Sequence, residues 1–126
     1  MDFSNVRFSS DHEWVRFDGD DTVSIGITEF AAGELGDVVY VELPAVGTEV
    51  KAGETMGTIE AVKTVADLFA PVSGTIMAIN ETLEDGPEQV NASPFEDGWF
   101  VKLKLSDRSE MDALMDADAY QEMTGK

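Results

Sequence analysis

Short apolar stretches alternate with clusters of turn-forming residues along most of the chain. In residues 22–27 and 101–105 every second residue is aliphatic, which is the period of a β-strand with one buried face. Gly, Pro and Asp clusters between the stretches favour tight turns. The pattern therefore predicts a mainly β protein, folded as a small barrel or sandwich. The predicted strands are residues 14–17, 22–27, 38–43, 55–60, 64–69, 75–80 and 100–105.

Two other parts of the chain have a helical pattern. Thr28 can cap a short internal helix that begins at Glu29 and ends at Gly33 or Gly36. A helical tail is predicted over about 107–124, because apolar residues recur there at spacings of three and four. Its candidate capping residues are Ser109 with Asp112, and then Asp116 or Asp118.

Composition limits what kind of molecule this is. The 126 residues, 43% of them apolar, suffice for one domain, which we expect to span residues 1–126. The absence of cysteine excludes disulfides, thiolate metal sites and a cysteine nucleophile. A net charge of −18 disfavours nucleic acid and anionic membranes as partners. No signal or transit peptide is visible, so we expect a cytoplasmic protein of a bacterium or archaeon. We also expect a monomer.

Lys63 has a distinctive position in the sequence. It lies ten residues after Gly53 and eleven before Gly74, so turns at both glycines would put it at the tip of a hairpin. A lysine at such a tip is well solvated and a poor base at neutral pH, but another enzyme can reach and acylate its amine. The same spacing also fits an ordinary solubilising lysine on a loop.

The residues around Lys63 resemble a known modification site. Residues 57–63 (GTIEAVK), followed by Asp67 and by residues 71–74 (PVSG), are similar to the lipoylation signature of glycine cleavage H proteins. The resemblance extends from about Ser9 to Met123 and therefore covers nearly the whole chain. Further matching motifs, in the same order as in the family, include residues 12–15, 26–29, 35–38, 41–44, 87–91 and 98–99.

The resemblance implies a fold, a cofactor and a set of partners. The fold is a barrel-sandwich hybrid of the lipoyl-domain type, with a short internal helix and C-terminal helices. Lipoate is attached covalently to Lys63 as N6-lipoyllysine, on an arm with a reach on the order of 15 Å. Members of the family are non-catalytic carriers in glycine catabolism and one-carbon metabolism, where enzymes and cofactors supply the chemistry.

Four partners follow from the same resemblance. The carrier takes an aminomethyl group from a PLP-dependent glycine decarboxylase to a tetrahydrofolate-dependent aminomethyltransferase. A dihydrolipoyl dehydrogenase then reoxidises the arm, and a lipoate-attaching enzyme installs it. Because the aminomethyl group is cationic and decomposes in water, a carboxylate should shelter it. Glu13 and Asp67 match the family's pattern at suitable positions and are the candidates.

The sequence gives little support for a metal-binding or catalytic site. His12 is the only histidine and is expected to tie down the N-terminal strand rather than to bind a metal or catalyse a reaction. We find no supported nucleophile or acid–base pair, so an enzyme is disfavoured. The chain departs from the family at Ala61 and Thr64, which flank the hairpin tip, and at Glu34, which would change the charge near the arm if it faced it.

Several related functions stay open. A biotin domain usually has methionines beside its lysine, and Val62 and Thr64 argue against it. A lipoyl domain of a 2-oxoacid dehydrogenase usually has aspartate before the lysine and belongs to a longer chain. An H-like lipoate relay and an unmodified β-rich interaction domain remain as alternatives.

Overall fold

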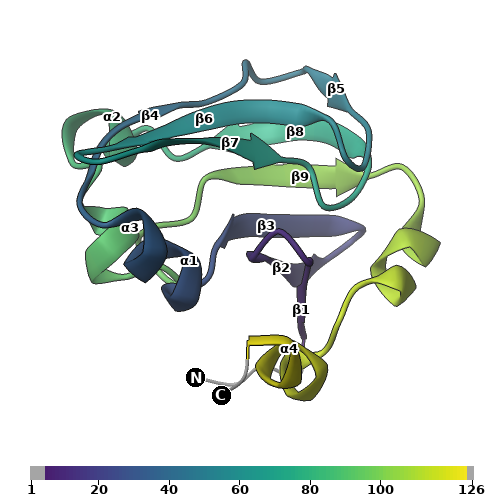
Figure 1. Ribbon diagram of the computed structural model, residues 1–126. Coiled ribbons are helices and arrows are strands. Elements are labelled where there is room, and N and C mark those ends of the chain that lie inside the picture. Colours follow the sequence, from purple (N-terminus) through teal and green to yellow (C-terminus); the bar gives the residue numbers. More distant parts are fainter. Residues whose placement is uncertain (1–4, 125–126) are drawn as a thin grey trace.

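Two antiparallel β-sheets form the framework of the computed structural model, which describes residues 5–124 (Figure 1). The larger sheet has the strand order β1-β2-β3-β9-β8-β5, and the smaller has the order β4-β6-β7. In the larger sheet the strands are β1 Val6–Phe8, β2 Glu13–Gly19, β3 Thr22–Ile27, β9 Val101–Leu105, β8 Gly74–Ile79 and β5 Glu49–Val50. In the smaller sheet they are β4 Val38–Glu42, β6 Thr55–Ala61 and β7 Val65–Phe69.

The helices in the described part of the chain are short. α1 (Glu29–Leu35) follows β3, and the short α2 (Thr82–Asp85) and α3 (Gln89–Ala92) lie between β8 and β9. A 3-10 helix (Arg108–Ala113) and α4 (Ala117–Thr124) form the C-terminal part. None of the helices in the described part of the chain is long and apolar enough to cross a membrane.

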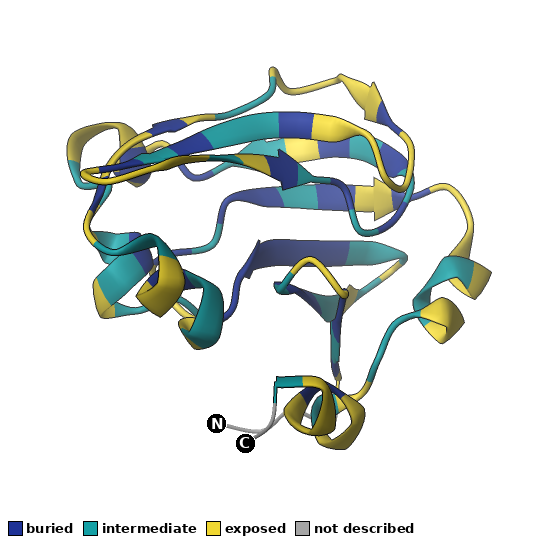
Figure 2. Ribbon diagram, in the orientation of Figure 1, coloured by how far each residue is buried: buried dark blue, intermediate teal, exposed yellow. Residues whose placement is uncertain are grey.

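The main core fills the space between the two sheets (Figure 2). Ile25 of β3 and Leu103 of β9 face it from the larger sheet, and Ile59 and Leu68 face it from the smaller. Each of these side chains is at most 2% exposed, and burying such an aliphatic group is worth about 1.5–3 kcal/mol. Alternation along β3 and β9 thus places every second residue of these two strands in the shared core.

A second cluster covers the outer face of the larger sheet. Val6, Phe8 and Trp14 pack there against Tyr120 of α4, and the rings of Phe8 and Tyr120 stack with centroids 4.7 Å apart. The backbones of Phe8 and Met115 exchange two hydrogen bonds of 2.7 and 2.8 Å. The C-terminal segment is therefore fixed to β1.

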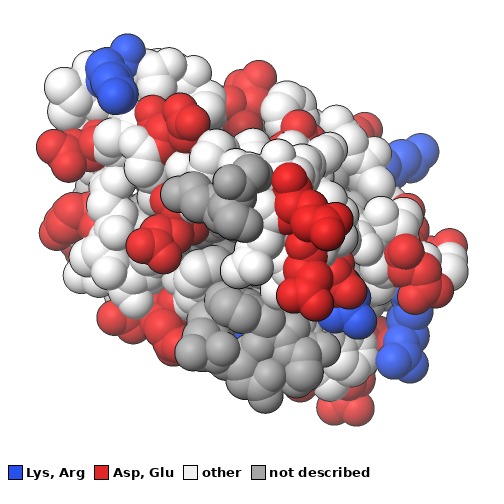
Figure 3. Space-filling model, turned by 60° about the horizontal axis from the view of Figure 1, so that its bottom comes forward, with Lys and Arg blue, Asp and Glu red and all other residues white. Residues whose placement is uncertain are grey.

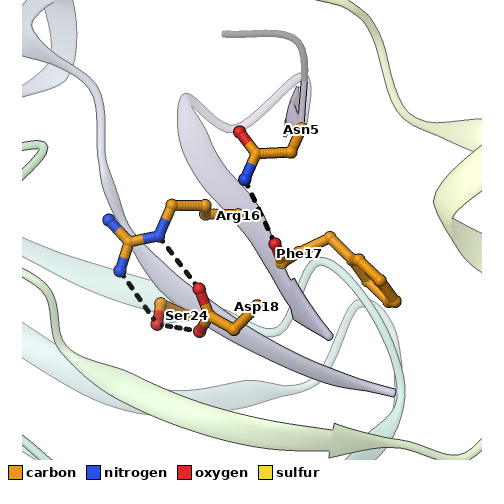
Figure 4. Close-up of polar contacts among 5 residues, drawn as sticks. All are labelled: Asn5, Arg16, Phe17, Asp18 and Ser24. Carbon is orange, nitrogen blue, oxygen red and sulfur yellow. Dashed lines mark hydrogen bonds and ion pairs between the residues drawn. The ribbon is translucent and has the colours of Figure 1, made fainter. Parts of the chain in front are cut away.

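A polar network joins the neighbouring strands β2 and β3 (Figure 4). Arg16 Nε donates to Asp18 Oδ1 over 3.1 Å, and Arg16 Nη2 donates to Ser24 Oγ over 3.3 Å. The Ser24 hydroxyl donates in turn to Asp18 Oδ2. At the edge, Asn5 Nδ2 donates to the carbonyl of Phe17 over 3.2 Å. These polar groups satisfy one another's hydrogen-bonding capacity, and they do not line the hollows described below.

The mainly β class is confirmed, and each predicted strand has an observed counterpart. The internal helix begins after Thr28, whose hydroxyl accepts from Ala31 N over 3.2 Å, and of the two predicted ends Gly36 is the observed one. The missed elements β1, β5, α2 and α3 span two to four residues each, too few to show a period.

One prediction in the tail is wrong. Asp107, rather than Ser109, caps the first tail helix, which is a 3-10 helix. The Asp107 carboxylate accepts from both the backbone and the hydroxyl of Ser109, over 3.0 and 2.6 Å. Of the two predicted capping residues of the second helix, Asp116 is the observed one, and it accepts from Ala119 N over 2.9 Å. The predicted domain limits, 1–126, include residues 1–4 and 125–126, which lie outside the described residues.

Candidate functional site

Lys63 lies in the tight turn between β6 and β7. Ala61 N donates to the carbonyl of Thr64 over 2.8 Å, which leaves Val62 and Lys63 as the two turn residues. Val62 N donates to the carbonyl of Asp37 over 3.0 Å and so fixes the turn to the residue before β4. Lys63 is exposed, and its amine can therefore be reached from solvent.

A hollow of about 610 Å³ lies beside Lys63, against α1. Gly36, the residue after α1, has φ of +81° and borders the lysine side chain. A Cβ at Gly36 would lie 3.2 Å from Lys63 Cε, so glycine leaves space for the lysine stem. The residues lining the hollow are Glu29, Phe30, Gly33, Glu34, Lys63, Gln121 and Thr124.

A second hollow, of about 320 Å³, shares the lining residues Phe30 and Glu34 with the first and therefore adjoins it. We call this second hollow the inner hollow. Part of its wall is apolar and part is acidic, and both Glu13 and Asp67 belong to the acidic part. The apolar wall consists of Ile27, Phe30, Ala31, Leu35, Ile59, Ala66 and Leu68. The two hollows place the exposed lysine and the two candidate carboxylates along one side of α1.

Glu13 is almost fully buried at the start of β2, with 2% of its surface exposed. Its Oε1 accepts from the Ser9 hydroxyl over 2.8 Å, and its Oε2 accepts from Phe69 N of β7 over 3.3 Å. Burial is the largest cause of a rise in the pKa of the Glu13 carboxyl from 4.5 to about 7. The nearby Asp11 contributes to the rise, and the hydrogen bonds from Ser9 and Phe69 N oppose it. A nearby cation would favour its ionised form.

The other carboxylates of the inner hollow are more accessible. Asp67 is exposed on β7, and Asp11 and Glu34 line the same hollow. Glu34 was expected to matter only if it faced the arm, and it lines both hollows. Several carboxylates around one small apolar hollow suit a ligand with an apolar stem and a cationic end.

His12, which precedes β2 and lines the inner hollow, is linked through Tyr120 to α4 and to the start of α1. It has φ of +66°, and its Nδ1 is hydrogen-bonded to Tyr120 Oη of α4 over 2.8 Å. Tyr120 Oη is also 2.6 Å from the hydroxyl of Thr28, the capping residue of α1. The contacts of His12 are structural, and residues 5–124 contain no group of three or more His, Asp or Glu side chains that could hold a metal.

Sequence reasoning identified Glu13 and Asp67 but missed their surroundings. Ser9 and the Phe69 amide, which both donate to Glu13, were not identified. Tyr120 is in the predicted helical tail, and its hydroxyl is hydrogen-bonded to both His12 and Thr28, contacts that the apolar pattern of the tail did not predict. A serine four residues before a glutamate could have suggested the first contact, but the others join distant parts of the chain and leave no local signal.

Comparison with known proteins identifies the family. Residues 6–126 match the family model of the glycine cleavage H-protein. The chain belongs to this family. An H protein of Staphylococcus haemolyticus is 55% identical over 123 residues, which are 98% of this chain and 97% of the relative. An H protein of Bacillus cereus is 54% identical over 123 residues, 98% and 96% of the two chains.

A solved structure of the same family has the same fold. The glycine cleavage system H protein of Mycobacterium marinum superposes with a TM-score of 0.90 and is 35% identical in sequence. The match covers 97% of this chain and 98% of the other. The similarity confirms the predicted barrel-sandwich fold of the H-protein family.

Proposed function

We propose that this protein is the lipoyl-bearing carrier of a glycine cleavage system, with lipoate attached to Lys63. The observation that supports the proposal most directly is the position of Lys63, exposed in a two-residue turn beside a hollow that leads to buried Glu13. Membership of the H-protein family supports the same function. The cytoplasmic location and the monomeric state stay predictions.

The residues beside Lys63 fit a lipoyl group. The amine is free to form an amide, and Gly36 leaves room for the lysine stem. The apolar wall, which includes Phe30, Leu35 and Leu68, suits a hydrocarbon chain. When attached, lipoate supplies a disulfide that can be opened, loaded and closed again, chemistry that a chain without cysteine cannot provide itself.

The protein's own residues would hold and shield the cargo. Glu13 and Asp67 attract a cationic aminomethyl group, and the buried Glu13 does so where water is scarce. Ser9 and the Phe69 amide keep the Glu13 carboxylate in place, so its orientation is set before the cargo arrives. Such preorganisation lowers the entropic cost of holding the cargo.

The proposed role is that of a non-catalytic carrier subunit. It is supported by membership of the H-protein family, whose members are named for the glycine cleavage system. The partners are the glycine decarboxylase, the aminomethyltransferase, the dihydrolipoyl dehydrogenase and the enzyme that attaches lipoate.

The test is the substitution Lys63→Arg. Arginine keeps the positive charge but stays protonated and offers no amine nucleophile, so lipoylation should fall to background while the fold is unchanged. The measurement is peptide mapping by mass spectrometry after incubation with a lipoate-attaching enzyme. Lys51→Arg, which changes an exposed lysine elsewhere, should be lipoylated like the parent. Lipoylation of Lys63→Arg on Lys51, Lys102 or Lys104 would refute the assignment.

A further inference from the structure

Exposed apolar side chains gather at the turn that holds Lys63. Seven large apolar residues in the described part of the chain are exposed, and four of them lie at the hairpin end of the smaller sheet. We name these four the hairpin collar: Val39 (54% exposed), Tyr40 (48%), Val62 (74%) and Val65 (62%). In so acidic a chain, grouped exposed apolar side chains indicate a contact surface.

The strand register brings the hairpin collar together. Tyr40 of β4 pairs with Glu60 of β6, and Glu60 pairs with Val65 of β7, so all three side chains share one face of the sheet. Val62 is next to Lys63 in the turn, and its hydrogen bond to Asp37 brings the turn close to the start of β4, near Val39. Figure 2 shows the turn and the adjoining part of β7 as an exposed end of the molecule.

The hairpin collar and the inner hollow occupy different places on the hairpin. Along β7, the consecutive residues Ala66, Asp67 and Leu68 line the hollow, whereas Val65, which is nearer the turn, does not. None of the four collar residues lines either hollow beside α1. The collar is therefore not explained by storage of the arm.

The reach of the Lys63 side chain, with and without lipoate, indicates which partner must touch this surface. An unmodified lysine extends only about 6 Å from its Cα, so an enzyme that acylates its amine must bring its surface against the turn. A lipoylated lysine extends on the order of 15 Å, so partners that act on its far end can work without touching the turn. Val62 and Val65, close to Lys63 in sequence, lie within the zone that the acylating enzyme has to cover.

We propose that the hairpin collar is the docking surface for the enzyme that acylates Lys63. This inference rests on the proposed function and adds to it the surface that is recognised. The matching face of the enzyme is apolar, with a basic side chain opposite Glu60, which lies between Tyr40 and Val65 in the register. A second copy of this chain fits less well, because two molecules with net charges of −18 repel each other.

The test compares lipoylation of matched variants of the full, unmodified chain. Val62→Thr combined with Val65→Thr replaces two exposed methyl groups by hydroxyls of similar shape and keeps the β-branched side chains. With a lipoate–protein ligase, lipoate and ATP, the KM for the carrier should rise about tenfold, while kcat changes less than twofold. Val46→Thr, a change at a 60% exposed valine outside the collar, should leave both constants at parental values.

An enzyme-free reaction completes the test. An N-hydroxysuccinimide ester of lipoate should label Lys63 equally fast in the parent and in both variants, because the amine itself is unchanged. The chemically labelled variants should then be accepted by the glycine decarboxylase like the parent.

Three results would overturn the inference. A parental KM for the Val62→Thr, Val65→Thr protein would show that the collar is not recognised. A loss confined to the decarboxylase reaction would assign the collar to a different partner. Failure of the ligase to modify the parent at Lys63 would refute the proposed function, and this inference with it.

Discussion

Glu13 combines burial with a position beside an open hollow. The side chain is 2% exposed, and its carboxylate accepts from Ser9 and from Phe69 N. Burial is the largest cause of the rise in its pKa to about 7. At neutral pH the group is therefore close to its midpoint, and a small change in its surroundings decides whether it is charged.

The raised pKa predicts how Glu13→Gln alters the pH dependence of stability. The folded protein binds the Glu13 proton more tightly than the unfolded chain, so the resulting stabilisation is present below pH 4.5 and is lost as pH rises through about 7. At about 1.4 kcal/mol per pKa unit, the stability of Glu13→Gln relative to the parent should increase by about 3 kcal/mol between pH 4.5 and pH 8. Urea unfolding at several pH values measures this difference.

The control for this prediction is Glu49→Gln, a change at an exposed carboxyl in β5. Its unfolding in the same urea series shows how much of the difference comes from replacing one exposed carboxyl by an amide. If Glu13→Gln behaves in the same way, Glu13 is not titrating near neutrality and its role as a buried acid is wrong.

A second prediction at Glu13 and Asp67 distinguishes attachment of lipoate from protection of the aminomethyl cargo. Glu13→Gln and Asp67→Asn should be lipoylated at the parental rate, because neither residue is in the turn. The aminomethyl cargo should be lost about ten- to a hundredfold faster, since a charge-assisted hydrogen bond contributes about 1.5–3 kcal/mol. Carriers loaded with labelled glycine and freed of decarboxylase would show this as label loss without tetrahydrofolate. Decay at the parental rate in both variants would rule out these shelters.

Sequence identified the candidate acids but not their physical states. Glu13 and Asp67 were selected by motif and appear alike in the sequence, yet one is buried with two donors and the other is exposed. The difference depends on Phe69, which is 56 residues away from Glu13 in the chain. Contacts between distant segments follow from tertiary packing, which local patterns do not encode.

At the scale of elements, α1 forms one wall of both hollows. It contributes Phe30 and Glu34 to each. Its start is held by Thr28, whose hydroxyl accepts from Ala31 N and is hydrogen-bonded to Tyr120 of α4. One hydroxyl therefore caps α1 and fixes it to the C-terminal helix.

Thr28→Val should destabilise the protein by about 2 kcal/mol. The substitution keeps the shape but removes the cap, worth about 1 kcal/mol, and leaves Tyr120 without one partner, at a similar cost. Thr28→Ser, which retains the hydroxyl, should stay within about 0.5 kcal/mol of the parent. Urea unfolding provides the measurement, and equal losses for Val and Ser would show that the hydroxyl is not responsible.

The predictability of the elements depended on their length. Strands of five to seven residues and α1 were found from period and capping, because several neighbouring residues support the same assignment. The strand β5, with two residues, exists only because β8 pairs with it. The contact between His12 and Tyr120 spans 108 residues and was likewise beyond sequence reasoning.

The molecule as a whole is strongly acidic. The chain has 26 Asp and Glu against 8 Lys and Arg, and on the face shown in Figure 3 carboxylates are scattered with few basic groups between them. Like charges at this density repel one another and oppose the compact state. Salt screens this repulsion, since the Debye length falls from about 30 Å at 0.01 M to about 3 Å at 1 M.

Added sodium chloride should therefore stabilise the fold. Between 20 mM and 500 mM we expect a gain of about 1 kcal/mol, or roughly 3–5 °C in Tm for a domain of this size. Thermal unfolding followed by circular dichroism gives the value, with potassium chloride as a check that the effect is one of ionic strength. A Tm that falls with salt would mean that attractive charge pairs outweigh the repulsion.

The bond between Glu13 and Phe69 joins strands of different sheets. Glu13 is in β2 of the larger sheet and Phe69 in β7 of the smaller, and the amide of Phe69 points at the Glu13 carboxylate over 3.3 Å. A charged acceptor deshields an amide proton more than a neutral one does. The chemical shift of this single amide proton therefore reports whether the Glu13 carboxyl is ionised, and NMR can measure it in the intact protein. It can follow the filling of the hollow without any label on the arm.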